Sequence, residues 1–271
     1  MECRLDDITV HYESFGAGRP LIFLPGWPDP GWVPADYLEP VFIGRPGWRR
    51  IYLDLPGRGA TKGEPWITTN DQVLDIVIRV IDQAIPGERF VLAGHSAGGY
   101  LARAALQHRF GLVDGLLQVV PVIDPADDDR PEPVTLVSEP GLFDRMTAEL
   151  GADAANRFAR AAVVASTEVY ERVKPVMAGV RDDRFLDHLD DSVSFGVDDL
   201  PAPFRKPALF VLGRQDAVVG FRSAFGLLDA YPRATVAVLD RAGHGLPWEQ
   251  EGLFRALVDE WLSRVEEVAG G

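Results

Sequence analysis

The stretch that decides the fold is Gly94-His95-Ser96-Ala97-Gly98-Gly99. The mostly apolar residues 89–93 precede it and predict a buried parallel strand, and the Leu- and Ala-rich residues 100–107 that follow predict a helix. Ser96 therefore lies at a strand-to-helix turn, with a glycine two residues away on either side. Such a sharp turn needs glycines where backbones approach closely, and it presents the Ser hydroxyl as a nucleophile. The alternative interpretation is a Gly-rich turn in which the Ser only caps a helix.

Outside this turn, buried strands and helices alternate along the chain. Strands are expected at residues 8–15, 21–24, 50–53, 116–123, 208–212 and 235–239. A capping box at Thr69 and Gln72 opens a helix with an apolar stripe, and further helices are expected over residues 221–230 and 253–262. This alternation predicts an α/β fold with a doubly wound, mostly parallel sheet.

Residues 125–204 break the alternation. They begin with an acidic, Pro-containing linker at residues 127–133, whose charges we interpret as a solvated surface. Four helices and no strand are expected beyond it, at residues 142–150, 152–165, 168–177 and 184–190. An insertion this long must form a layer of its own. We therefore expect a core of residues 1–124 and 205–271, with a helical cap of residues 125–204 inserted into it.

The candidate catalytic residues all follow closely on predicted strands, at the sheet edge where ligands bind in such folds. A Ser nucleophile needs a base, and His244 stands in a glycine-flanked loop after the last strand. A carboxylate must orient that base; Asp216 follows the strand at residues 208–212, and Asp124, after another strand, is its rival. The other histidines fall in predicted strands or helices or inside the Ser motif, and they are weaker candidates: His11, His95, His108 and His188.

Four segments together resemble the α/β-hydrolase superfamily, in particular its small, capped, cofactor-independent serine hydrolases. They are GHSAGG at residues 94–99, DLPGRGAT at 54–61, GRQDAVV at 213–219 and AGHGLPWE at 242–249. The resemblance spans residues 8–265, and the order Ser, Asp, His along the chain is the order of that superfamily. It implies a triad of Ser96, Asp216 and His244, with no cofactor and no metal.

The loop after the early strand departs from the superfamily pattern. Members usually carry His-Gly there, whereas this chain has Pro25-Gly26. The resemblance implies an oxyanion hole formed by the backbone N–H groups of Trp27 and Ala97, although a neighbour of Trp27 remains an alternative donor. Val219 also stands where Pro is common, a change that we expect to be harmless.

These features imply hydrolysis of an ester or related acyl bond through an acyl-Ser96 intermediate. The same triad also serves hydrolysis of C–C bonds, lactones or thioesters, and cofactor-free lyase or perhydrolase chemistry, so fold and triad leave these alternatives open. A receptor-like protein that binds a ligand and turns over slowly is the alternative of another class.

The apolar stripes of the cap should roof the pocket above Ser96. The expected substrate-binding residues are Trp27, Phe143, Met146, Leu246 and Trp248. A mostly apolar roof and a formal net charge of −14 favour a small, neutral, fairly apolar substrate.

Composition narrows the expected partners and location. The acidic charge disfavours nucleic-acid binding, and no apolar run approaches the length of a membrane span. The single Cys3 excludes an intramolecular disulfide, and the N-terminal residues do not read as a secretory leader. We therefore expect a cytoplasmic protein whose partner is a small-molecule substrate, with no nucleic acid and no membrane; the oligomeric state stays open.

Overall fold

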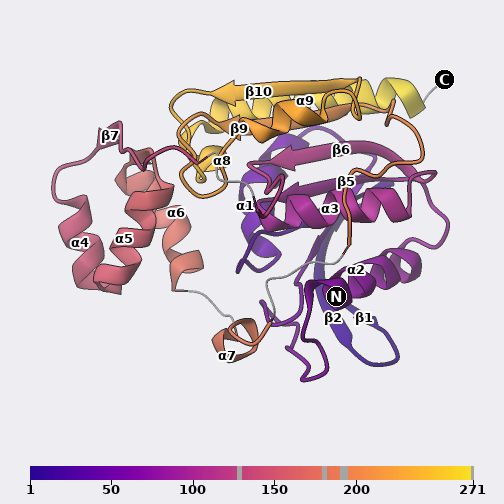
Figure 1. The fold of residues 1–271 in the computed structure, drawn as a ribbon, viewed down its shortest axis with the longest axis horizontal. Coiled ribbons are helices and arrows are strands. Elements are labelled where there is room, and N and C mark those ends of the chain that lie inside the picture. The colour runs from indigo at the N-terminus through magenta and orange to yellow at the C-terminus, as the bar shows by residue number, and fades with distance from the viewer. Residues whose placement is uncertain (127–129, 179–181, 190–194, 270–271) are drawn as a thin grey trace.

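Eight strands of the described chain form the central sheet (Figure 1). The computed structural model describes residues 1–126, 130–178, 182–189 and 195–269. In spatial order the strands are β1 (Glu2–Arg4), β2 (Thr9–Gly16), β4 (Trp48–Leu53), β3 (Arg19–Leu24), β5 (Phe90–His95), β6 (Val113–Val119), β9 (Ala208–Gly213) and β10 (Ala234–Leu239). β2 pairs antiparallel with β1 and β4, and all strands from β4 to β10 pair in parallel. The predicted α/β fold with a mostly parallel sheet is confirmed.

The register brings the ends of four parallel strands to one edge. Leu24 at the end of β3 lies opposite Gly94 near the end of β5. Gly94 in turn lies opposite Gln118 of β6, and Gln118 lies opposite Phe210 of β9. The loops that follow these strands therefore emerge side by side, at the edge where α/β sheets bind ligands.

Helices cover both faces of the sheet. α2 (Asn70–Ala84) and α3 (Ala97–His108) pack on one face, and α1 (Trp32–Leu38) and α9 (Glu251–Ala269) pack on the other. Successive residues of β3 point to opposite faces of the sheet. Leu24 packs with α2 and α3, and Phe23 packs with α1 and α9. A strand buried on both sides needs a continuous apolar run, which is the pattern found in the sequence. None of the described helices is long and apolar enough to cross a membrane.

Several elements differ from the sequence-based expectation. β6 ends at Val119 rather than at residue 123, because Pro121 lacks the N–H that continued pairing requires. A short 3₁₀ helix, η2 (Ser223–Leu227), replaces the α-helix expected over residues 221–230, where Gly226 lowers the helix propensity. Three short elements carry too little periodicity to be predicted: β1, α1 and the 3₁₀ helix η1 (Glu39–Phe42).

The inserted block between β6 and β9 is mainly helical, as expected. It contains α4 (Leu142–Leu150), α5 (Ala152–Ala161), α6 (Thr167–Met177) and α7 (Asp183–Leu186). It also contains a parallel pair of two-residue strands, β7 (Val137–Ser138) and β8 (Val164–Ala165), where no strand was expected. Residues 127–129 of the acidic linker and Asp190 at the end of the last expected helix lie outside the described residues. In Figure 1 the arrowheads of β6 and β10 point toward α4, α5 and α6, so the insertion lies beyond the carboxyl ends of the strands.

Arg103 of α3 ties the two ends of this insertion together. Its side chain is fully buried, and its Nη1 and Nη2 donate to the carbonyls of Val122 and Ile123, just after β6. Its Nε lies 3.1 Å from a carboxylate oxygen of Asp198, on the segment that returns to the core. The Tyr231 hydroxyl donates to the other oxygen of Asp198. The chain thus leaves and re-enters the core at one fixed point.

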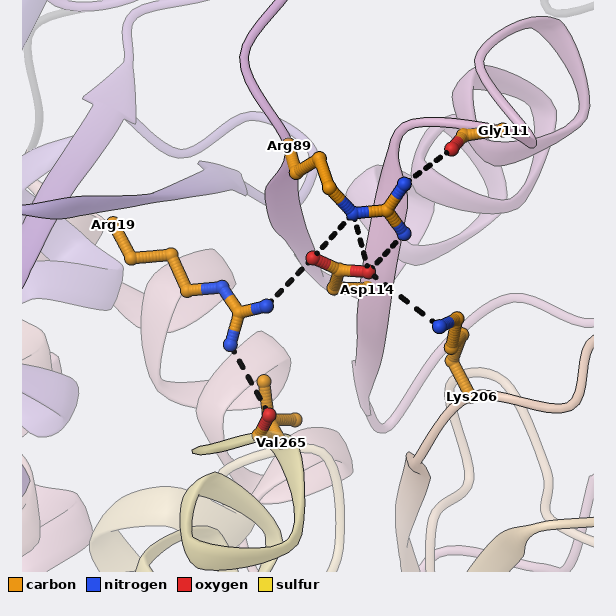
Figure 2. Close-up of polar contacts among 6 residues, drawn as sticks. All are labelled: Arg19, Arg89, Gly111, Asp114, Lys206 and Val265. Carbon is orange, nitrogen blue, oxygen red and sulfur yellow. Dashed lines mark hydrogen bonds and ion pairs between the residues drawn. The ribbon is translucent and has the colours of Figure 1, made fainter. Parts of the chain in front are cut away.

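A buried carboxylate fixes the opposite end of the sheet (Figure 2). Asp114 at the start of β6 accepts hydrogen bonds from Arg19 Nη2 at 2.6 Å and from Arg89 Nε at 3.0 Å. Arg19 also donates to the Val265 carbonyl of α9, and Lys206 Nζ lies 3.9 Å from Asp114. Burial alone would raise the pKa of Asp114, but the two guanidinium groups outweigh burial and lower it. The cluster therefore joins β3, β5, β6 and α9.

The substitution Asp114→Asn tests this cluster. We expect the free energy of unfolding to fall by about 2 kcal/mol at neutral pH, because two guanidinium groups lose their anionic acceptor. Since the folded-state pKa is depressed, the stabilisation is present above the unfolded-state value of about 3.9 and is lost as the pH falls through the folded-state pKa. Urea unfolding of both proteins from pH 7 down to pH 3 should show the difference shrinking; a constant difference would contradict this account.

Candidate active site

The turn at Ser96 has the strained backbone that the glycine pattern predicts. Ser96 has φ 53° and ψ −123°, a region that costs a non-glycine residue about 1–3 kcal/mol. A Cβ atom on Gly94 would lie 2.3 Å from the Gly98 carbonyl oxygen, and one on Gly98 would lie 2.2 Å from the Leu24 carbonyl oxygen. Side chains at either position would therefore push β5, α3 and the end of β3 apart. The Ser96 amide donates to the Val119 carbonyl at 3.0 Å, which holds the turn in place.

The structure brings Ser96, His244 and Asp216 together in one hydrogen-bonded chain. His244 Nε2 lies 3.0 Å from Ser96 Oγ, and His244 Nδ1 lies 2.9 Å from Asp216 Oδ2. The other oxygen of Asp216 accepts hydrogen bonds from the amides of Val218 and Val219. The rival Asp124 is exposed, and its carboxylate accepts from the nearby Ala126 amide instead.

The electrostatics of this series of hydrogen bonds suit a general base at His244. Burial alone would lower the pKa of His244, but the charge and hydrogen bond of fully buried Asp216 outweigh burial and raise the pKa above 6.5. A carboxylate that accepts from Nδ1–H leaves Nε2 free to take the Ser96 proton. The geometry therefore places a proton acceptor at Ser96 Oγ.

The loop that carries His244 is held by a carboxylate that sequence reasoning missed. Glu249 of α8 (Leu246–Glu249) accepts from the Gly243 amide at 2.6 Å. Its other oxygen accepts from the amides of Val163 and Val164 in the insertion. Burial raises the pKa of Glu249, although the three amides oppose this shift. The signal in the sequence is only that Glu249 closes the segment AGHGLPWE, five residues after His244.

The expected oxyanion donors lie beside Ser96. Gly26 passes so close that a Cβ atom on it would lie 3.2 Å from Ser96 Cβ, and Trp27 follows directly. Ala97 is the first residue of α3, where amides have no partner within the helix. Among the described residues, neither the Trp27 nor the Ala97 amide donates a hydrogen bond. Both N–H groups are thus available to a substrate oxygen.

His95 is a buried imidazole next to the partly buried His244. Its ring centroid lies 5.3 Å from that of His244, and a Cβ on Gly26 would lie 3.0 Å from its Nδ1. Burial, together with the charge of His244, lowers the pKa of His95 to about 3. His95 therefore stays neutral at all ordinary pH values and fills space between β3 and the His244 loop.

A cavity of about 270 Å³ lies beside the turn at Ser96; its wall includes Ala97, the residue after Ser96, but neither Ser96 nor His244. Trp27, Ala97 and Gly98 form the wall nearest the turn. Apolar side chains dominate the remainder, with Arg58 and Asn70 among them; this part of the wall comprises Pro25, Gly26, Leu55, Tyr100, Leu101, Val122, Pro125 and Phe195. Trp27 is thus the expected substrate-binding residue that lines the cavity.

The other four expected substrate-binding residues lie elsewhere in the described structure. Met146 is fully buried in a core formed by the helices of the insertion themselves, and Phe143 packs against that core. Leu246 is fully buried in the main core, and the Trp248 ring packs edge-on against Tyr37. A helical stripe identifies a face that must be buried, but not what covers it. Here the helices of the insertion bury their stripes against one another.

Arg58 is a wall residue that sequence reasoning missed. It lies in the loop after β4, within the segment DLPGRGAT, and only 3% of its surface is exposed. Burial lowers its pKa to about 10, and the charge of Asp29 opposes this shift. The guanidinium therefore remains protonated at neutral pH. Nothing in the sequence distinguishes it from a surface arginine of the same loop.

Comparison with known proteins agrees with this architecture. A family model described as the alpha/beta hydrolase family matches residues 21–257. The chain belongs to this family. A non-heme chloroperoxidase of Kitasatospora aureofaciens is 27% identical to this α/β-hydrolase, over 94% of this chain and 96% of its own length. A 2-hydroxy-6-oxononadienedioate/2-hydroxy-6-oxononatrienedioate hydrolase of Paraburkholderia phymatum is 26% identical, over 95% and 92%.

A solved structure gives the same assignment. An alpha/beta superfamily hydrolase of Oenococcus oeni superposes with a TM-score of 0.83 at 27% identity, covering 98% of this chain and 99% of that one. The superfamily inferred from four sequence segments is therefore confirmed. The names of the relatives differ in the reaction they state, so they support a hydrolase-family enzyme without selecting a substrate.

Titration of His244 tests the electrostatics of this site without an activity assay. NMR of the histidine ring nitrogens should give a pKa for His244 above the ordinary value of about 6.5. In Asp216→Asn the pKa should fall below that of the parent, because burial remains and the compensating charge is gone. His108 is an internal reference on another part of the surface. An unchanged His244 pKa in the variant would contradict the assigned coupling.

Proposed function

We propose that this α/β-hydrolase cleaves an ester or related acyl bond of a small substrate through a covalent acyl-Ser96 intermediate. The observation that carries the proposal is the unbroken chain of hydrogen bonds from Ser96 Oγ through His244 to Asp216. A Ser hydroxyl is a poor nucleophile at neutral pH unless a base removes its proton. His244 is that base, with its Nε2 3.0 Å from Ser96 Oγ.

The first half of the reaction forms the acyl-enzyme. His244 Nε2 accepts the proton of Ser96 as Oγ attacks the carbonyl carbon, and Asp216 stabilises the resulting imidazolium. The amides of Trp27 and Ala97 donate to the oxyanion. His244 then gives its proton to the leaving alcohol, and the bond from the carbonyl carbon to the leaving oxygen breaks.

The second half consumes water. His244 takes a proton from a water molecule, the hydroxide attacks the acyl carbon, and the bond to Ser96 Oγ breaks as Oγ recovers the proton. The product is a carboxylic acid, and the enzyme returns to its starting state. All the groups used lie within one cluster, so no domain motion is required to assemble them.

The cavity supports a small substrate with a fairly apolar body. Its volume of about 270 Å³ lies at the lower end of the range for ligand pockets. Leu55, Leu101 and Val122 present aliphatic carbon, and each substrate methylene buried there contributes up to about 0.8 kcal/mol.

The substitution Ser96→Ala is the principal test. We expect a fall in kcat of about 10⁴-fold or more with substrate binding retained, because Oγ forms the covalent bond. A fluorophosphonate probe should label the parent at Ser96 and leave the variant unlabelled. Turnover of a series of acyl chain lengths and leaving groups separates an enzyme from a slow receptor-like protein. Activity within tenfold of the parent would reject the mechanism.

Replacement of the carboxylates tests the assignment of the third residue. Asp216→Asn should lower kcat by about 10⁴-fold, since an amide favours the wrong tautomer of His244. Asp124→Asn is the matched control and should stay within about threefold of the parent, because Asp124 is exposed and its carboxylate accepts a hydrogen bond from the Ala126 amide rather than from His244. Steady-state kinetics on one activated ester measures both; the reverse order of severity would transfer the role to Asp124.

A further inference from the structure

The cavity beside Ser96 contains a buried positive charge that the proposed reaction does not use. Arg58 lines this cavity, and its side chain is almost completely withdrawn from solvent. Removing a guanidinium from water is costly unless an anion or several hydrogen bonds replace the water. The contacts of Arg58 therefore show whether the protein itself supplies an anion or enough hydrogen-bond acceptors for the guanidinium.

The described residues supply only some of the partners that the buried guanidinium of Arg58 requires. Arg58 Nε and Nη1 are buried and have no hydrogen-bond partner among the described residues. The described chain also places no carboxylate within ion-pair distance of the guanidinium, although the charge of Asp29 acts on it from farther away. The Trp27 ring lies under it, with Arg58 Cζ 4.3 Å from the ring centroid. This cation–π contact fixes the plane of the guanidinium without satisfying its N–H groups.

The loop that carries Arg58 is held rigidly in place. Asp54 at its start accepts from the Ala60 amide at 2.9 Å and from the Gly31 amide at 2.7 Å, and it also contacts His11. A Cβ atom on Gly59 would lie 2.3 Å from the Asp54 carboxylate, so the loop closes tightly around that side chain. Arg58 is therefore positioned before any ligand arrives.

We propose that Arg58 binds a carboxylate group of the substrate. The inference rests on the proposed function and specifies its substrate class: small acyl compounds that carry a free carboxylate in addition to the bond that Ser96 cleaves. A planar guanidinium matches a carboxylate with two parallel hydrogen bonds. The neutral substrate expected from overall charge and the cap stripe is replaced, because net charge acts at long range and is screened by salt, whereas Arg58 lines the cavity itself.

The layout of the cavity fits one molecule that uses both groups. Ala97 and Trp27, the expected oxyanion donors, line the same cavity as Arg58. The rest of the wall is mainly apolar and includes Leu55 and Leu101. An anionic group entering this cavity finds its ionic partner in Arg58, while the apolar stretch accommodates the carbon chain. Arg58 thus orients the acyl carbon toward Ser96.

The test uses matched pairs of substrates at three chain lengths. Mono-4-nitrophenyl esters of succinic, glutaric and adipic acid are compared with esters in which the free carboxylate is replaced by a primary amide. For at least one length the parent enzyme should favour the carboxylate over the amide by about 10- to 100-fold in kcat/KM, the range for a hydrogen bond to a charged group. Arg58→Met should abolish that preference, measured as the ratio of kcat/KM within each pair. Arg58→Lys should retain part of it.

Two controls separate binding from support of the loop. Arg205→Met removes the same charge from an exposed position that does not line the cavity, and it should preserve the preference. Isothermal titration of Ser96→Ala with monomethyl glutarate and its amide analogue measures the same preference without any change at Arg58. This arm keeps the test decisive if Arg58→Met does not fold.

Specific results would overturn the proposal. The carboxylate site is rejected if the parent treats the paired esters equally, or prefers the amide, at all three lengths. It is also rejected if Arg58→Met lowers kcat/KM for both members of each pair by the same factor, because Arg58 would then only support the Trp27 loop. In either case, fluorophosphonate labelling of Ser96 and hydrolysis of the amide esters would leave the acyl-serine mechanism standing.

Discussion

Close packing between α3 and the end of β3 is the constraint on which the site depends. No Cβ atom fits at residue 98, because the carbonyl oxygen of Leu24 occupies its place. This contact sets the strained turn at Ser96 against the loop that begins with Pro25 and Gly26. As a result, Ala97, the first residue of α3, and Trp27 line the same cavity. One steric fit thus brings together two segments that lie about 70 residues apart in the chain.

Two neighbouring imidazoles show how local surroundings assign different properties to one residue type. His95 is buried and His244 is partly buried, and burial alone disfavours the charged form of each. Only His244 has a carboxylate at 2.9 Å, and its pKa is raised whereas that of His95 is lowered to about 3. A permanently neutral His95 does not add a second positive charge beside His244 when that imidazole is protonated. The pair therefore combines a titrating base with an inert spacer.

Local sequence patterns predicted the framework well and the cavity poorly. Strands buried on both faces produce continuous apolar runs, and the turn at Ser96 needs glycines at fixed positions, so both could be recognised from the chain alone. The predicted Ser96, Asp216 and His244 lie together because each follows a parallel strand at one sheet edge. Cavity walls depend instead on which surfaces meet. Met146 and Phe143 carry the same apolar pattern whether they roof a pocket or pack within the cap.

Charged wall residues and short elements escaped prediction for related reasons. Arg58 differs from a surface arginine only through the folding of its loop around Asp54, a contact with Gly31 and Ala60 that periodicity does not encode. Strands of two residues, such as β7 and β8, contain no repeat at all. They form because the chain returns after α4 and α5, so that residues 164–165 run beside residues 137–138.

The hydrogen bonds of Glu249 have a consequence for how this enzyme can diverge. All three of its partners, at Gly243, Val163 and Val164, are main-chain amides. The hydrogen bonds that join the His244 loop to the inserted block therefore do not depend on which side chains the block carries. Side chains of the insertion can therefore be replaced while the His244 loop keeps its anchorage, as long as the main chain at Val163 and Val164 keeps its course.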